Sequence, residues 1–146
     1  MVIDAHQHFW QIDRGDYSWM DDSVAAIRKD YLPRDMVHHA HACGVTGTVV
    51  VQAAPTVDET LFLLQLADRH EIIKAVVGWI DLAGDVVEQL SHISHPALRG
   101  VRPMLQDIEE TDWILRDEVV EGLGRIANAG LRLDALITSR HLRSEE

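Results

Sequence analysis

Short segments rich in β-branched residues alternate with helical patterns along this chain of 146 residues, and the alternation limits the fold more than any other feature. In residues 59–70, for example, apolar side chains recur at the i, i+3, i+4 spacing of an amphipathic helix. A succession of strand, helix and strand is typical of a parallel α/β sheet. The sequence therefore predicts such a sheet, with strands at residues 2–9, 46–52, 72–81, 98–105 and 131–137.

Two of these strands, at 46–52 and 72–81, are apolar almost without interruption. Alternation of apolar and polar residues fades where a parallel sheet is covered on both faces, so both are predicted to be interior strands. Helix ends also carry signals. Thr56 followed by Glu59 has the spacing of a capping box, and Gly44 and Gly130 each follow a helical pattern where a C-terminal cap is expected. The capping box alone explains Glu59, so we assign it no catalytic role.

Charge and composition exclude several classes of protein. The chain has a net charge of -11 and no run of Lys or Arg, so it would repel phosphate backbones and no nucleic-acid partner is expected. Cys43 is the only cysteine, which excludes an internal disulfide. No apolar run approaches the roughly 20 residues that cross a bilayer, and the chain opens without a secretory leader. These features predict a cytoplasmic protein with no membrane partner.

One long connection, from Trp10 to about Pro33, carries more aromatic surface than a plain turn needs. Long loops in compact domains are usually functional or disordered. We expect this one to form a pocket wall. Its large apolar side chains are Trp10, Tyr17, Trp19, Met20 and Tyr31.

His6 and His8 are two residues apart in the first predicted strand, with Asp4 two residues before them. Residues at i, i+2 and i+4 of a strand project from the same face, so the two imidazoles can converge on one divalent cation. In a barrel they would lie at the carboxyl end of the strand, where active sites are built. The alternative is a pair of strand histidines satisfied by hydrogen bonds.

A second group of histidines provides a comparison. His38, His39 and His41 lie in a helical pattern, where residues i and i+2 point in different directions. His38 and His41 are three apart and could share a face, but a solvated helix surface explains the group. We interpret His92 and His95, which flank a turn, in the same way.

Polar residues close the other predicted strands, with Gln52, Asp81 and Arg102 at the ends of the second, third and fourth. A guanidinium at the rim of a barrel can hold a substrate carboxylate or stabilise an oxyanion that develops during hydrolysis. The alternative role of Arg102 is an ion pair with a nearby acid such as Asp107. Arg102 is therefore a candidate substrate contact.

The opening segment Ile3-Asp-Ala-His-Gln-His-Phe-Trp10 resembles the first-strand motif of the amidohydrolase-related family, in the amidohydrolase superfamily. That family contains sugar-lactonases, such as fuconolactonases and rhamnonolactonases, and sulfomuconolactone hydrolases. Later segments resemble successive landmarks of the same family, in the same order. They are Asp30-Tyr-Leu-Pro33, Val49-Val-Val-Gln-Ala53, Glu59-Thr60, Val76-Val-Gly-Trp-Ile-Asp81, Leu98-Arg-Gly-Val-Arg102 and Leu131-Arg-Leu-Asp134.

The resemblance implies a truncated TIM (β/α)8 barrel with about five βα units, residues 1–146 forming a single incomplete domain. It implies an enzyme, a hydrolase that opens a lactone ring with water, in which His6 and His8 are catalytic. The same two residues would hold a divalent metal, Zn or Mn, although some members work without one. Arg102, Gln52 and Trp10 would contact a small-molecule substrate, an acidic or sugar-derived lactone.

The family pattern also has a later histidine and a catalytic aspartate near the last strand, and this chain ends before them. A complete barrel takes about 250 residues. The chain alone is therefore expected to be weakly active or inactive. Alternatives are a catalytically silent module that binds a small molecule or a metal, and a truncation product without function. Open edges beside the first and fifth strands predict a homo-oligomer.

Overall fold

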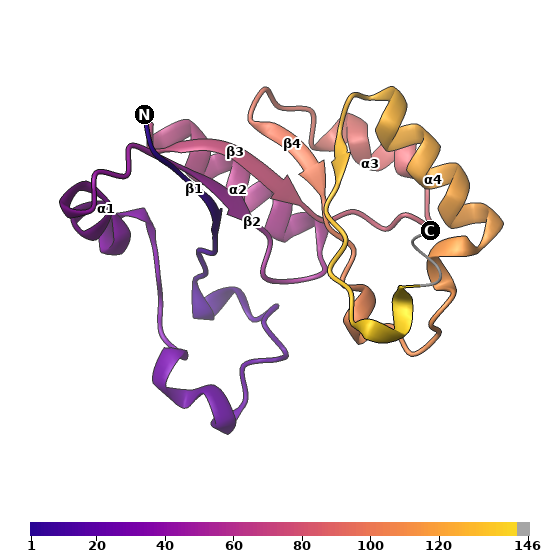
Figure 1. Cartoon of the computed structure of the whole chain (residues 1–146), viewed down its shortest axis with the longest axis horizontal. Helices are drawn as coiled ribbons and strands as arrows, with labels where there is room; N and C mark the ends of the chain where they lie inside the picture. Colours follow the sequence, from indigo (N-terminus) through magenta and orange to yellow (C-terminus); the bar gives the residue numbers. More distant parts are fainter. Residues whose placement is uncertain (143–146) are drawn as a thin grey trace.

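A computed structural model describes residues 1–142 and contains the five predicted strands, all parallel and paired in chain order (Figure 1). Each strand is shorter than predicted, because the residues at its carboxyl end turn away into loops instead of continuing the ladder. The strands are β1 (Ile3–Gln7), β2 (Gly47–Val51), β3 (Ile73–Gly78), β4 (Leu98–Val101) and β5 (Arg132–Leu133).

The sheet curls as half of a TIM barrel. β2, β3 and β4 have a neighbour on each side, which confirms the interior position predicted for β2 and β3. β1 and β5 are the edges, and in the described part of the chain no strand pairs with their outer sides. The sheet is therefore open along two lines.

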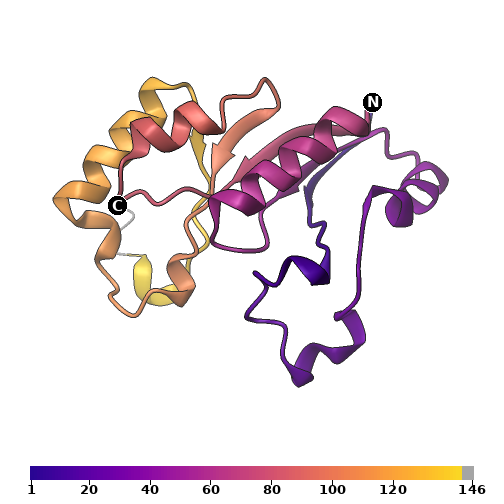
Figure 2. The same ribbon diagram turned by 180° about the vertical axis from the view of Figure 1, so that it is seen from behind.

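Helices follow the strands, as the alternation predicts. The α-helices are α1 (Pro33–Ala42), α2 (Val57–Arg69), α3 (Val86–His92) and α4 (Asp117–Asn128). Short 3-10 turns η1 (Ile12–Arg14), η2 (Asp22–Ile27), η3 (Leu105–Asp107), η4 (Trp113–Leu115) and η5 (Ser139–His141) occupy the connections. α2 covers one face of the strands and lies in front of them when the molecule is seen from behind (Figure 2).

The main core lies between the sheet and this layer of helices. Val50 of β2, Val76 of β3 and Leu63 of α2 are fully buried there. Gly78 lets α2 approach closely, since a Cβ atom at this position would lie 2.4 Å from Cγ2 of Thr60. The Thr60 hydroxyl accepts a hydrogen bond from the Trp79 amide and donates one to the Trp79 carbonyl, both at 2.7 Å. This face of the sheet is closed.

Helix ends agree with the sequence in part. The Thr56 hydroxyl accepts from the Glu59 amide at 3.0 Å, so Thr56 is the N-cap of α2 as predicted. Gly44 and Gly130 have φ of 73° and 76°, the left-handed conformation expected of a C-terminal cap. The capping box also predicts that the Glu59 side chain accepts from the Thr56 amide, and this prediction is wrong. The Glu59 carboxylate accepts from the amide of Ala53 instead of returning to Thr56.

Residues 11–30 form an excursion that leaves the barrel layer after β1, below the strands in Figure 1. Trp10 and Tyr31 close its base by exchanging two backbone hydrogen bonds, at 2.9 and 3.0 Å. Tyr17 and Met20 are buried against Ala53 and Ala54, which follow β2, and form a second small core. Within residues 1–142, no helix is long and apolar enough to span a membrane.

Candidate active site

His6 and His8 meet at the carboxyl end of β1. Their Nε2 atoms lie 2.9 Å apart, and the ring planes are inclined at 72°. His6 belongs to the strand and is exposed, whereas His8 follows it and is half-buried. The convergence predicted from strand parity is confirmed.

Hydrogen bonds define which nitrogen of each ring carries a lone pair. His8 Nδ1 lies 2.9 Å from the Val51 carbonyl, which can only accept, so the neutral ring carries its proton on Nδ1. His6 Nε2 lies 3.2 Å from Nη1 of Arg102, which can only donate. Two lone pairs therefore face each other across the 2.9 Å gap between the Nε2 atoms. A proton on Nε2 of either ring, or a metal cation between the two rings, would stabilise this arrangement.

Burial disfavours a proton on His8. Burial of the ring lowers the pKa of His8, the hydrogen bond to Val51 opposes this, and the charge of Arg102 adds to the lowering. The negative charge of Asp134 raises the same pKa by a smaller amount. The neutral ring, with its free Nε2 lone pair, is therefore favoured at neutral pH.

Arg102 follows β4 and reaches across the ends of the strands. The side chain donates to the Gln52 carbonyl at 3.1 Å as well as to His6, and burial lowers the pKa of its guanidinium. The alternative ion pair with Asp107 does not form, because none of the ion pairs within residues 1–142 includes Arg102. The charge of Arg102 is thus available at the site.

Gln52 contacts Arg102 at the ends of the strands. Its amide donates to the Arg102 carbonyl at 3.0 Å, so the two residues exchange hydrogen bonds between the ends of β2 and β4. Gln52 is fully buried. Gln52 Oε1 and Arg102 Nε are buried without a protein hydrogen-bond partner. The direct substrate contact predicted for Gln52 stays a prediction.

A cleft of about 390 Å³ opens beside the histidine pair. His6, His8 and Arg102 supply its polar surface at the strand ends. Trp10 and Trp19 form an aromatic wall, which places part of the long connection where the sequence predicted it. The remaining lining includes Met104, Gln106, Asp107 and Leu136.

Asp81 lies after β3 and Asp134 after β5, and the structure separates the two carboxylates. Asp81 is exposed, and its backbone amide donates to the side chain of Gln89 on α3 at 2.8 Å. Asp134 follows β5 directly, beside Arg102 in the parallel register, and its amide donates to the Val101 carbonyl at 2.9 Å. Its charge raises the pKa of both His8 and Arg102. Asp134 therefore acts on the site through its charge, whereas Asp107 lines the cleft.

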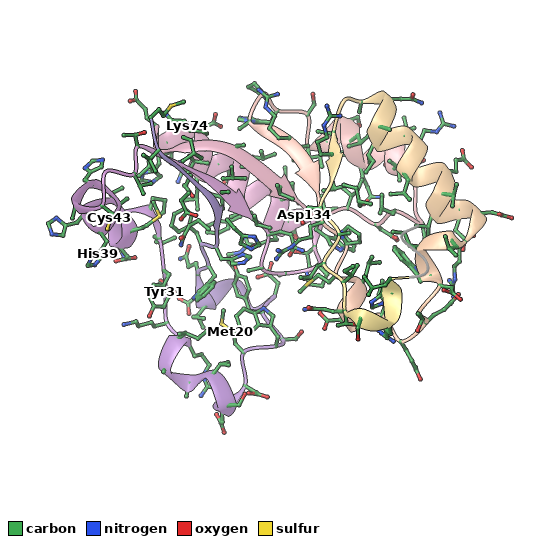
Figure 3. The ribbon with its side chains drawn as sticks, in the orientation of Figure 1. Met20, Tyr31, His39, Cys43, Lys74 and Asp134 are labelled. Atoms are coloured by element: carbon green, nitrogen blue, oxygen red, sulfur yellow. The ribbon has the colours of Figure 1, made fainter. Side chains whose placement is uncertain are left out.

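The other histidines lie elsewhere. His38, His39 and His41 are on α1, with His39 far from Asp134 in Figure 3. His95 lies 3.0 Å from Asp68 and ends a loop before β4. In the part of the chain that the structure describes, no three His, Cys, Asp or Glu side chains are arranged to hold a metal ion. The strand-end pair is a two-nitrogen site.

A half-barrel of parallel strands with paired histidines and an arginine at the carboxyl ends belongs to the class of TIM-barrel folds, whose active sites lie at this rim. Comparison with family models makes the class specific. Residues 3–146 match the model of the amidohydrolase family, so the chain belongs to that family.

Two curated relatives carry the same activity in their names. An L-fucono-1,5-lactonase of Burkholderia ambifaria is 43% identical over 96% of this chain and 49% of its own length. An L-fucono-1,5-lactonase of Burkholderia multivorans is 35% identical over 96% of this chain and 48% of its own length. The chain therefore spans about half the length of the curated relatives that it matches.

Solved structures agree with the fold. The crystal structure of an amidohydrolase from Burkholderia multivorans with bound zinc superposes with a TM-score of 0.92 and 33% identity, over 99% of this chain and 51% of that one. A probable 2-pyrone-4,6-dicarboxylic acid hydrolase from Acinetobacter baumannii has a TM-score of 0.71 at 14% identity, over 92% of this chain and 48% of its own, and shows the fold alone.

Proposed function

We propose that this chain supplies the first half of an active site that opens a sugar-derived lactone with water. One observation carries the proposal, namely the convergence of His6, His8 and Arg102 beside a cleft at the strand ends. The lactonase relatives, at 43% and 35% identity, support the choice of substrate class.

The reaction adds one water molecule across the ester. Water oxygen bonds to the lactone carbonyl carbon, the bond from that carbon to the ring oxygen breaks, and one proton of the water moves to the released alkoxide. Charge develops on the carbonyl oxygen during the addition. Arg102 is the buried cation closest to the histidines, and we assign it to that oxygen or to an anionic group of the substrate. Trp10 offers an apolar face for the sugar ring.

The donor set fits a divalent cation such as Zn or Mn. His6 and His8 would hold it through the Nε2 lone pairs that face each other, and the Val51 carbonyl fixes the tautomer of His8. When bound, such an ion lowers the pKa of a coordinated water and polarises a carbonyl. Without the ion, a ring of the pair that carries a proton on Nε2 would donate a hydrogen bond to the attacked carbonyl.

Asp134 is our candidate for moving the proton. The carboxylate follows β5 beside Arg102 and forms no ion pair among residues 1–142. It can accept a proton from the attacking water and return it to the alkoxide. Gln52, which exchanges hydrogen bonds with Arg102, is assigned to holding that residue in place.

The presence of two histidine ligands, and not three, among the described residues also supports a second function. Catalytic zinc sites use three protein ligands and one open position, and residues 1–142 bring together two histidines without a third ligand. A silent module that binds a metal or a small molecule would have this arrangement. Hydrolysis and binding are separated by the experiment below.

We also propose that the 146 residues form one domain that self-associates. The backbone groups on the outer sides of β1 and β5 have no strand partner in the described part of the chain. Edge strands of this kind pair with other chains. Light scattering on the purified chain should show dimers or larger species, and a stable monomer would contradict this.

The test of function measures Zn2+ affinity and hydrolysis of L-fucono-1,5-lactone. His8→Ala should weaken Zn2+ binding at least tenfold, whereas His38→Ala on α1 should leave it unchanged. Hydrolysis should be near background for the chain alone and should appear when the C-terminal half of the B. ambifaria relative is added. Zn2+ binding without hydrolysis in the mixture would favour the silent module, and equal loss in both variants would exclude the strand-end site.

A further inference from the structure

We propose that Glu59 is a positioning residue for the aromatic wall of the cleft. Its carboxylate fixes Ala53 and Tyr17, and through them it holds the indole of Trp19 beside the histidine pair. The assignment of the cleft to a lactone rests on the proposed function. The positioning itself is a property of the chain and is testable without a substrate.

The Glu59 side chain is fully buried and its two oxygens serve different segments. Oε1 accepts from the Ala53 amide at 3.0 Å, and Oε2 accepts from the Tyr17 hydroxyl at 2.9 Å. Helix capping does not explain these contacts, because the Thr56 amide donates to the Ala54 carbonyl. Burying a carboxylate is costly unless it is well hydrogen-bonded, so the position of Glu59 depends on both partners and theirs on it.

Ala53 connects this carboxylate to the wall. Its amide donates to Glu59, and its carbonyl accepts from Nε1 of Trp19 at 2.7 Å. Trp19 in turn packs edge-to-face on Trp10, with ring centroids 5.8 Å apart. Both indoles line the cleft that holds His6 and His8. A shift of Ala53 or Tyr17 would therefore move the surface that a ligand meets.

Backbone hydrogen bonds close the base of the excursion but, among the described residues, do not attach it to β2 or α2. Within residues 1–142, no backbone–backbone hydrogen bond joins residues 11–30 to β2, α2 or the loop between them. Side chains make the connection instead. Besides the Tyr17 and Trp19 contacts, Thr56 donates to Asp16 at 3.2 Å, and Nη2 of Arg14 lies 3.4 Å from Glu59. The wall is therefore set by a polar network centred on Glu59.

The network also predicts which substitutions preserve the wall. Burial raises the pKa of the Glu59 carboxyl, while the Ala53 amide, the Tyr17 hydroxyl and Arg14 oppose the rise. A neutral amide with the same shape can still accept from Ala53. Glu59→Gln should therefore retain the wall, whereas Glu59→Ala should release it.

The direct measurement is the rate of hydrogen exchange of the Trp19 indole N–H, recorded by NMR on the 146-residue chain. The Trp19→Phe variant assigns the indole resonance. Loss of the two Glu59 hydrogen bonds should speed this exchange about tenfold in Glu59→Ala. The Trp113 indole provides the reference within the same molecule. Glu59→Gln, and Asp58→Ala on the same turn of α2, should each stay within about threefold of wild type.

Unchanged Trp19 exchange in Glu59→Ala, or an equal rise in Asp58→Ala, would overturn the proposal. If Glu59→Ala does not fold, Tyr17→Phe decides, because it removes only the contact with Oε2. A rise clearly larger than that in Asp58→Ala would support positioning, and a rise no larger than in that control would contradict it.

A ligand titration separates the two proposals. L-fuconate, the product expected of the lactone, should shift the Trp19 indole resonance and bind about tenfold more weakly to Glu59→Ala. No response of the wild-type chain to L-fuconate would count against the lactone assignment, and the exchange measurement would still decide the role of Glu59.

Discussion

On the outer face of the sheet, Val50 and Val76 are fully buried against α2, whereas the neighbouring Val49 and Val77, which point to the inner face, are only half-buried. The inner face carries chemistry at its rim, where His6 is exposed and Arg102 brings a charge. Successive residues of a strand point to opposite faces. A single step along β2 or β3 therefore separates packing from function.

This difference teaches where the free energy of folding resides. The outer face is closed by helices and supplies the apolar burial that stabilises the half-barrel. The inner face of a complete barrel is filled by side chains from all its strands. Within residues 1–142, five strands contribute to that face. We expect substitutions on the two faces to act on different observables.

The largest effect is expected on the outer face. Leu63→Ala removes a fully buried side chain from α2 and should lower the free energy of unfolding by about 2 to 5 kcal/mol. Val77→Ala, on the inner face, should cost less than about 1.5 kcal/mol because that side chain is half-buried. Urea unfolding of both variants measures the contrast. Similar losses in the two would show that the inner face is packed as well.

Arg102→Ala should act mainly on function. The variant is assayed in the barrel assembled with the second half of a relative. A charge-assisted contact contributes about 1.5 to 3 kcal/mol, so its loss should lower kcat/KM for the lactone about ten- to 150-fold. The melting temperature should change less than it does in Leu63→Ala. Normal kinetics together with a large drop in melting temperature would assign Arg102 to structure.

His8 predicts how stability depends on pH. Burial, the first cause, lowers the pKa of the ring in the folded chain, so the unfolded chain binds this proton first as pH falls. The contribution of His8 to the free energy of unfolding is fully present above its pKa in the unfolded chain, about 6.5. This contribution is lost as the pH decreases below that value. One proton gives a slope of at most about 1.4 kcal/mol per pH unit. Denaturation of wild type and His8→Gln between pH 7.5 and 5.5 should show the steeper fall in wild type.

The smallest effect is expected at Asp81. This exposed residue bonds to α3 on the outer side, whereas Asp134 lies at the inner rim beside Arg102. Asp81→Asn should change lactone hydrolysis by less than about twofold, and Asp134→Asn should lower it about a hundredfold, in the range of general acid–base catalysis. Assays of the matched pair in the assembled barrel test this. Equal activity of the two variants would remove Asp134 from the mechanism.

The spacing of two residues predicted that His6 and His8 share a face, and the structure brings them together although His8 lies just beyond the last residue of β1. Strand ends were less predictable. Ile80 and Leu82 continue the apolar run after β3, yet they are buried as loop residues and not as ladder residues. Hydrophobicity reports burial, and it does not show where hydrogen-bonded pairing stops.

The role of Glu59 was beyond the sequence for a different reason. A capping box explains the spacing of Thr56 and Glu59 locally, and local patterns are all that a single sequence exposes. The partner that draws the carboxylate away, Tyr17, is 42 residues distant and arrives only when the excursion folds. Gln52 is similar, since its burial depends on Arg102, 50 residues further along.

The backbone bridge between Trp10 and Tyr31 has a consequence for how proteins of this kind diversify. Because the two hydrogen bonds bring both ends of residues 11–30 to one point, the segment can lengthen, shorten or be replaced while β1 and α1 keep their places. Closing a longer loop adds little entropic cost, about 0.6 kcal/mol for each doubling of length. Residues 11–30 can therefore vary in length and sequence between two fixed ends. New ligand preferences can arise in this segment by insertion or recombination, without disturbing the histidines encoded a few codons upstream.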